Sequence, residues 1–460
     1  MQNTGLAPIA IIGGGASGAA AVLHLAREAF ARPIMLFERG LSIGRGLAYS
    51  TRHPQHWLNV AAARMSIYAD KPDHFLNWCI RSKAVNSPAC AETPIGVFAN
   101  RMLYGAYIEE EVMRAAGARD TLSLVNDEVV DIERRHGGYE LMCASGRTHS
   151  VGGVVLALGH PRRGKGGAGG AFEGADPWSF DPQSARSDQP VVIVGTGLTM
   201  VDVAISLASS GLAAPILAIS RRGLLPRAHA SKTERAAPRV TPHDGRSALG
   251  LLRRVRREIE RGRHDGACWR SVIDSYRPVT QEIWQSMPAA ARSQFLRHLR
   301  PWWDVHRHRL APGAVEQVQQ LIGKGQLQVA AGRIVAVEER NGEISVTWRP
   351  RGSPATRTIA AQTVIDATGI DGAGDGSEPL RARMSERGLT RPGPMGLGID
   401  VTRDLRVLDR NGDPHRRLWA LGPITRGVFW ECIAVPDIRV QAANLAAHVM
   451  AEMSPQAVGS

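Results

Sequence analysis

The chain has 460 residues, 43% of them hydrophobic and 22% charged, with a formal net charge of +13. Its length predicts about two to three domains with sizeable cores. No apolar run approaches the roughly twenty residues that a membrane helix needs, and the N-terminus lacks the features of a signal peptide, so we expect a cytoplasmic protein with no membrane partner. The excess charge is mostly arginine scattered along the chain, which favours small anionic ligands over nucleic acid.

The first apolar run, residues 8–12, leads into a glycine pattern typical of dinucleotide binding. In a strand-turn-helix unit, the first glycine permits a tight turn, the second lets the backbone approach a pyrophosphate, and the third allows close helix–strand packing. An acidic residue ends the next apolar run, where it can accept hydrogen bonds from the ribose of FAD or NAD. We name residues 13–18 the first glycine loop. The cofactor ligands predicted here are Gly13, Gly15, Ala16, Ser17, Gly18, Glu38 and Arg39.

A second glycine pattern follows the apolar run 191–194. Its third glycine is replaced by Met200, and two arginines stand where the first pattern has its acid. A guanidinium can pair with phosphate through two hydrogen bonds, so these arginines favour the 2′-phosphate of NADPH over NADH. The alternative is an ordinary buried strand with a surface arginine pair. We name residues 195–200 the second glycine loop. The ligands predicted here are Gly195, Gly197, Leu198, Thr199, Arg221 and Arg222.

Two dinucleotide sites of different kinds indicate a flavoenzyme, with FAD at the first loop and NADPH at the second. The fold class that follows is α/β, with two Rossmann-like domains. Glycines also end later apolar runs, at Gly159, Gly369 and Gly422, and we expect them beside the cofactors. The predicted FAD-binding domain is split into residues 1–185 and 359–460. The predicted NADPH-binding domain, residues 186–358, lies between them, with a helical insert at about 230–325.

Cysteine spacing argues against one class of enzyme with two dinucleotide sites. Disulfide reductases need a redox-active pair such as C-x-x-C. No such spacing occurs among the five cysteines, Cys79, Cys90, Cys143, Cys268 and Cys432. We also expect no metal site, because the histidines around residue 307 have no partners at a known ligand spacing.

Several segments carry a more specific signal than the glycine patterns. They are residues 44–51, 56–61, 73–78, 195–202, 303–310, 422–425 and 436–439. Together they resemble bacterial FAD/NAD(P)-binding proteins of the YdhS-like type over nearly the whole chain, and Met200 is that family's own form of the second pattern. The resemblance implies a fold related to class B flavin monooxygenases and N-hydroxylases. It also implies flavin contacts for Gly46, Tyr49, Leu58 and Asn59.

These sites predict a monooxygenase in which a C4a-hydroperoxyflavin transfers oxygen while the protein excludes water and presents the substrate. Asn59 is the candidate polar group over the isoalloxazine, although an Asn bonded to its own turn is equally compatible. Arg307 and Arg309 would share one face of a strand and could clamp a carboxylate, whereas on a helix they would diverge. We therefore expect Asn59, Arg307 and Arg309 to be catalytic. The expected substrates are O2 and a small amine or amino acid that bears a carboxylate and is N-hydroxylated.

Two aspartates have predicted supporting roles. Asp437 precedes the last predicted helix, where it can act as N-cap while the helix N-terminus faces the flavin. Asp202, in the helix after the second glycine loop, is expected to be structural. Two other interpretations share these patterns: an NADPH-dependent flavin oxidoreductase without oxygen insertion, and a non-catalytic flavin redox sensor. A homodimer is also compatible with the sequence.

Overall fold

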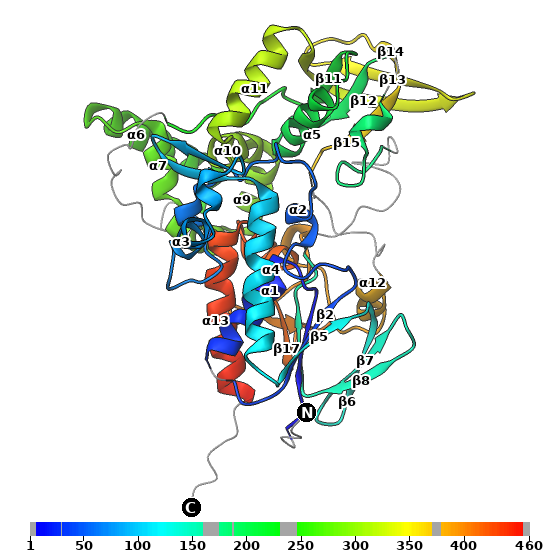
Figure 1. The fold of residues 1–460 in the computed structure, drawn as a ribbon. Helices are drawn as coiled ribbons and strands as arrows, with labels where there is room; N and C mark the ends of the chain where they lie inside the picture. The colour runs from blue at the N-terminus through cyan, green and yellow to red at the C-terminus, as the bar shows by residue number, and fades with distance from the viewer. Residues whose placement is uncertain are drawn as a thin grey trace, which may run out of the picture.

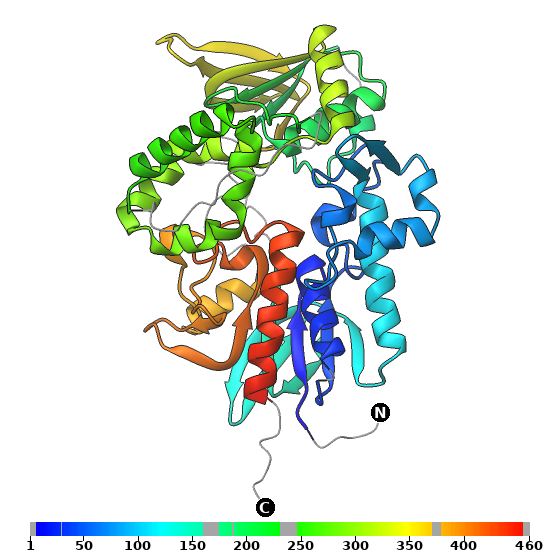
Figure 2. The ribbon, with the colours of Figure 1, turned by 90° about the vertical axis from the view of Figure 1, so that its left-hand side faces the viewer.

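Two sheets stand at opposite ends of the computed structural model, with helices between and beside them (Figures 1 and 2). Each sheet has six strands, in the orders β16-β17-β9-β1-β2-β5 and β14-β13-β12-β11-β10-β15. No helix in the described part of the chain is long and apolar enough to cross a membrane. The structure describes residues 6–28, 30–159, 174–185, 188–230, 246–369 and 379–453.

The first sheet is built from both ends of the chain. Its central strand β1 (Ile9–Ile12) pairs in parallel with β2 (Ile34–Glu38) and β9 (Gly153–Leu156). From the C-terminal part, β17 (Pro414–Ala420) pairs in parallel with β9. β1 and β9 are buried along their whole length, as expected for parallel strands that are apolar on both faces. The other main elements of this half are α1 (Ala16–Arg27), α2 (Gly46–Tyr49), α3 (His74–Arg81), α4 (Arg101–Gly117), β5 (Leu122–Asn126), α12 (Pro379–Glu386), β16 (Arg406–Leu408) and α13 (Val435–Met453).

Helices and two small antiparallel sheets complete this half. Helix α1 packs against both α13 and α4, and Figure 2 shows α1 and α13 side by side. Helix α12 packs on β6. The small sheets are the hairpin β3 (Cys90–Thr93) and β4 (Gly96–Ala99), and the meander β6 (Val129–Arg135), β7 (Gly138–Cys143) and β8 (Thr148–Val151).

The second sheet repeats the local order of the first. Its strand β10 (Val191–Val194) pairs in parallel with β11 (Ile216–Ser220) and β15 (Thr363–Asp366), as β1 does with β2 and β9. The predicted domain boundary after residue 358 is therefore wrong for β15, because this strand completes the second sheet. The remaining elements here are α5 (Leu198–Ser209), α11 (Pro312–Gly323), β12 (Leu327–Arg340), β13 (Glu343–Pro350) and β14 (Arg357–Ala361).

A helical insert lies between β11 and α11, and it has its own hydrophobic core around Trp284. The predicted insert extended too far, because α11 packs on α5 and shares the core of the second sheet. The helices of the insert are α6 (Ala248–His264), α7 (Trp269–Ser275), α8 (Thr280–Ser286), α9 (Ala289–Gln294) and α10 (Arg300–Arg307), with a π-helical turn at Phe295–Leu299 before α10. The predicted α/β class with two Rossmann-type sheets is confirmed.

Candidate dinucleotide-binding cleft

The first glycine loop connects β1 to α1 in a geometry that only glycine permits. Gly13 has a φ of +101°, and a Cβ there would collide with the carbonyl oxygen of Ala157, the residue that follows β9. A Cβ on Gly18 would collide with the carbonyl oxygen of Gly13. Helix α1 begins at Ala16 without a side-chain cap, so its first N–H groups are available to an anion.

The acid predicted to bind a ribose lies beside this loop. Glu38 ends β2, and its two carboxylate oxygens accept hydrogen bonds from the backbone N–H groups of Gly14 and Gly40, each at 2.8 Å. Each oxygen keeps a lone pair for a further donor. Arg39 points elsewhere, because it pairs with Glu128 at 3.1 Å. The position of Glu38 fits a ribose ligand, whereas the structure gives Arg39 a different partner.

The second glycine loop repeats the same turn between β10 and α5. Gly195 has a φ of +117°, and a Cβ there would collide with the carbonyl oxygen of Ala367, which follows β15 as Ala157 follows β9. A Cβ on Gly197 would meet no atom within 4 Å, because this residue borders an open cleft. Met200, in the place of the third glycine, is fully buried in α5.

The cleft has a volume of about 1110 Å³ and lies between the two halves. One wall comes from the first half, through Tyr49, Leu58 and Asn59, and the opposite wall is the second glycine loop with Leu198 and Thr199. Helix α10 of the insert contributes a third side. Of the predicted residues, Tyr49, Leu58, Asn59, Gly195, Gly197, Leu198, Thr199, Arg221, Arg222 and Gly369 all border this one space.

Two segments lead from the first glycine loop into the cleft. Helix α2 begins at Gly46, whose Cβ position lies 3.2 Å from Cα of Gly15, and ends at Tyr49 in the cleft wall. The segment after β17 begins at Gly422, where a Cβ would collide with the hydroxyl of Ser17, and reaches the cleft at residues 433–436. An extended dinucleotide with one end on the first loop would therefore have its other end in the cleft. Gly159, with a φ of +70°, follows β9 at the same edge of the sheet.

Asn59 is held by its backbone. Its carbonyl oxygen accepts a hydrogen bond from His229 Nε2 at 2.9 Å, while the residue borders the cleft. Beside it, Tyr49 packs edge-on against Tyr104 at 4.8 Å, and burial raises the pKa of Tyr49 to about 12. The catalytic role of Asn59 stays a prediction.

An arginine cluster lies at the end of the cleft formed by the second sheet. Arg221 and Arg222 follow β11, and Ser220 pairs with Ala331 of β12, which brings this turn close to Arg333. Arg333 lies directly opposite Arg349 on β13, and both border the cleft. Like charges directly opposite on one face destabilise a sheet unless an anion lies between them. None of Arg221, Arg333 and Arg349 has a carboxylate within 4.0 Å among the described residues.

The predicted carboxylate clamp of Arg307 and Arg309 does not exist. Arg307 ends α10 rather than lying on a strand, and its Nε is 3.0 Å from Glu431 Oε2 in a buried pair. Burial alone would raise the pKa of Glu431, but Arg307 and His308 hold it below its usual value. Arg309 points the other way, to Asp274 at 2.7 Å and over the ring of Trp269. Both arginines are committed to internal carboxylates.

Asp437 also differs from its predicted role. It lies inside the first turn of α13 instead of capping it, and its carboxylate pairs with Arg277 of the insert at 3.2 Å. A negative charge in the first turn still interacts favourably with the helix dipole. Burial raises the pKa of Asp437 despite this pairing.

Buried polar contacts join the two halves beside the cleft. Arg101, at the start of α4, pairs with Asp202 of α5 at 2.8 Å, and His56 Nε2 lies 2.8 Å from Ser206 Oγ of the same helix. Burial raises the pKa of Asp202 to about 6, although Arg101 acts in the opposite direction. The pair links helix α5 of the second glycine loop to the first half, which is compatible with the structural role predicted for Asp202.

No cysteine borders the cleft among the described residues. Cys79 and Cys90 do share a hydrogen bond between α3 and β3, which their sequence spacing does not reveal. No cluster of three or more potential metal ligands occurs in the described ranges.

A family described as FAD-NAD(P)-binding matches residues 10–161. The matched region holds the first glycine loop, Glu38, α2 and Asn59, which are the parts that the geometry above relates to a dinucleotide. Over the full length, the chain is 20% identical to an uncharacterized protein of Mycobacterium tuberculosis, with 98% of this chain and 96% of that protein aligned.

Solved structures share the whole fold. The ornithine N-hydroxylase of Kutzneria sp. 744 superposes with a TM-score of 0.66 at 14% identity, covering 98% of this chain and 100% of that one. The L-lysine 6-monooxygenase of Pseudomonas syringae gives 0.63 at 16% identity, with the same coverage. The bacillithiol disulfide reductase of Bacillus cereus gives 0.54 at 13% identity, covering 97% and 99%. At these identities the likeness is one of fold.

Sequence reasoning missed several cleft residues. Arg333 and Arg349 are brought together by strand register, and Arg300 and Arg426 border the cleft from segments without a recognisable motif. Asp304 lies in the family-like segment 303–310, but the sequence did not indicate that its side chain borders the cleft. One available signal was overlooked. The Ala-x-Gly that follows β9, at 157–159, recurs after β15 at 367–369, and this repeat places β15 beside the second glycine loop.

Proposed function

We propose that the protein is an FAD-containing, NADPH-dependent monooxygenase that hydroxylates the nitrogen of a small amino acid or similar carboxylate-bearing amine. The observation that carries the proposal is the single cleft bordered by Asn59 of the matched region, the second glycine loop and helix α10. When bound, FAD supplies the oxygen activation and NADPH supplies the electrons. The protein's own part is to hold both, exclude water and orient the amine.

The choice of NADPH rests on the arginine cluster. The apposed pair Arg333 and Arg349 gains stability from an anion between them, and Arg221 adds a third cation at the same end. A 2′-phosphate is such an anion, whereas the ribose hydroxyl of NADH is neutral. The open position beside Gly197 supports approach of the pyrophosphate to the N-terminus of α5.

The substrate class rests on the charges that helix α10 and Arg426 bring to the cleft. Arg300 and Arg426 border the cleft beside Asp304, which pairs with Arg300 at 3.2 Å. Burial raises the pKa of Asp304. One carboxylate among guanidinium groups can receive the ammonium end of an amino acid while its carboxylate meets an arginine. These residues replace the discarded clamp of Arg307 and Arg309 as the support for an amino acid substrate.

Oxygen insertion is favoured over dithiol chemistry because the described lining of the cleft contains no cysteine. A flavin oxidoreductase without oxygen insertion is the main alternative. The fold is similar both to N-hydroxylases and to a disulfide reductase, so the similarity is compatible with oxygen insertion and with an oxidoreductase that inserts no oxygen.

The test is to supply the FAD-loaded protein with NADPH, isotopically labelled O2 and a panel of amino acids, and to analyse the products by mass spectrometry. We expect one amino acid to accelerate NADPH oxidation and to gain one labelled oxygen on nitrogen. Matched esters should be poor substrates because they lack the carboxylate. NADPH oxidation that never labels an amine would refute the N-hydroxylase proposal and leave the oxidoreductase.

A further inference from the structure

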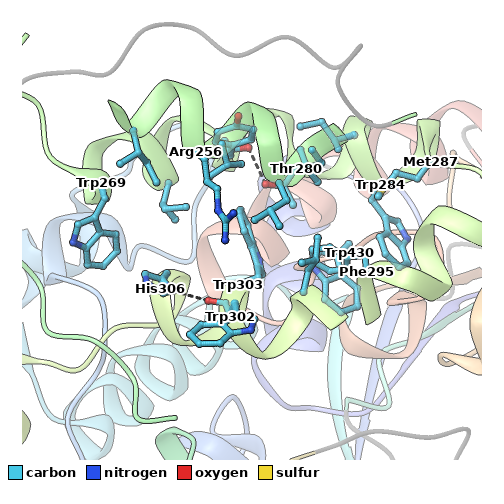
Figure 3. Close-up of a pocket in the computed structure, with 18 residues that line it drawn as sticks. Arg256, Trp269, Thr280, Trp284, Met287, Phe295, Trp302, Trp303, His306 and Trp430 are labelled. Atoms are coloured by element: carbon cyan, nitrogen blue, oxygen red, sulfur yellow. Dashed lines mark hydrogen bonds between the residues drawn. The ribbon is translucent and has the colours of Figure 1, made fainter. Parts of the chain in front are cut away.

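The helical insert forms a second cavity, of about 370 Å³ and open to solvent on one side, between α6 and α10 (Figure 3). Its size is far beyond the packing voids of an ordinary protein core and falls in the range of small-molecule sites. Five of the ten tryptophans of the chain border it, together with Phe295 and aliphatic side chains. The tryptophans are Trp269, Trp284, Trp302, Trp303 and Trp430.

Helix α10 separates this tryptophan cavity from the dinucleotide cleft. Trp302, Trp303 and His306 border the cavity, whereas Arg300, Asp304 and His308 border the cleft. The spacing places the two sets on different faces of the helix. A molecule in the tryptophan cavity would therefore be bound apart from the cofactors.

One charged side chain enters the tryptophan cavity. Figure 3 shows the guanidinium of Arg256 extending from α6 toward Trp303. Among the described residues it has no carboxylate within 4.0 Å and no ring stacked on it. Three other polar groups of the lining have internal partners: Thr280 Oγ1 donates to the carbonyl of Tyr276 at 2.8 Å, His306 Nδ1 lies 2.7 Å from the carbonyl of Trp302, and Trp303 Nε1 donates to Glu431 Oε1 at 2.6 Å.

We propose that the tryptophan cavity binds a small organic acid with a flat aromatic body, distinct from the amine substrate of the cleft. Aromatic rings stack on tryptophan faces and edges, which accounts for the lining. The carboxylate of the ligand pairs with Arg256, which supplies the one cation at an otherwise apolar site. Arg256 is exposed, so its guanidinium lies where a carboxylate entering the cavity from solvent can reach it.

The experiment is isothermal titration of the FAD-loaded protein with naphthalene-1-acetate, compared with the neutral naphthalene-1-acetamide. We expect one binding site, quenching of tryptophan fluorescence, and binding of the amide weaker by about tenfold or more, the value of a charge-assisted hydrogen bond. Arg256→Gln should weaken the acid by a similar factor and leave binding of the amide unchanged. The matched control is Arg253→Gln, which is on the same helix and exposed like Arg256 but lies outside the lining, and which should bind like the wild type.

Because Arg256 does not border the cleft, Arg256→Gln should keep the wild-type rate of NADPH oxidation, which verifies folding independently of the proposed monooxygenase activity. Equal affinity of acid and amide, or of Arg256→Gln and wild type for the acid, would overturn the proposal. A protein dimer that dissociates when the probe binds would also overturn the proposal, because the cavity would then be an interface between two copies of the chain.

Discussion

Gly195 and Gly197 stand two residues apart in the second glycine loop, and alanine should affect them in opposite ways. At Gly195 the φ of +117° and the carbonyl of Ala367 both exclude a Cβ. The backbone conformation costs about 1–2 kcal/mol for a non-glycine residue, and the collision adds about 1–3 kcal/mol. Gly195→Ala should therefore lower the free energy of unfolding by about 2–5 kcal/mol.

At Gly197 the φ is −84° and no atom lies within 4 Å of the Cβ position. Alanine reduces the entropy of the unfolded chain, which gains about 0.4–1 kcal/mol. It is also a poorer N-cap than glycine for α5, by a few tenths to about 1 kcal/mol. The two effects nearly cancel, so the stability of Gly197→Ala should stay within about 1 kcal/mol of the wild type. Its methyl group projects into the cleft, where we expect the pyrophosphate.

The assay has two parts. Denaturant unfolding without nucleotide measures stability, and titration of NADPH under anaerobic conditions measures binding. We expect Gly195→Ala to be destabilised, and Gly197→Ala to be stable but to bind NADPH at least about tenfold more weakly, a loss of about 1.4 kcal/mol. Wild-type NADPH affinity in a stable Gly197→Ala protein would refute the position assigned to the pyrophosphate.

Three further predictions follow from the same contacts. Replacing Arg221 and Arg333 together by Gln should weaken the binding of NADPH by roughly tenfold to a hundredfold for each lost charge-assisted bond, and should change the binding of NADH little. Equal losses of affinity for the two nucleotides in inhibition assays would contradict a 2′-phosphate site. Burial raises the pKa of Asp202 in the folded protein to about 6, above its ordinary value of 3.8. Folding therefore favours the protonated carboxyl, and the wild type should lose about 3 kcal/mol of unfolding free energy relative to Asp202→Asn as the pH rises from below 4 to above 6. A pH-independent difference between the two in denaturant unfolding would show that this carboxyl is not perturbed. Arg309→Ala should lower the melting temperature, because it removes the partner of Asp274, and should leave the KM of the amine substrate unchanged; a raised KM in a stable variant would restore the discarded clamp.

The predictable part of this fold lies in short local patterns. Apolar runs ending in glycine identified β1, β10 and the turns after them, because the φ values above zero at these turns require glycine, and Gly13 and Gly195 are visible in the sequence. Glu38 at the end of β2 could also be predicted, because one strand-helix-strand unit fixes its distance in sequence from the first glycine loop.

Contacts between distant segments could not be predicted. Arg307 was predicted to bind a substrate carboxylate because nothing near it in the sequence reveals its partner Glu431, which lies shortly before α13 in the C-terminal part of the chain. Arg333 and Arg349 meet only through the register of β12 and β13. The strand β15 was assigned to the wrong sheet because its apolar composition suits either one, and only the repeated Ala-x-Gly after it distinguishes them.

The most direct test of the account is anaerobic mixing of the FAD-loaded protein with NADPH while the visible flavin absorbance is followed. If one cleft holds both dinucleotides, the flavin should be bleached by one equivalent of NADPH, and Gly197→Ala should need a much higher NADPH concentration for the same rate. A protein that retains FAD but keeps its flavin oxidised at saturating NADPH would contradict the account.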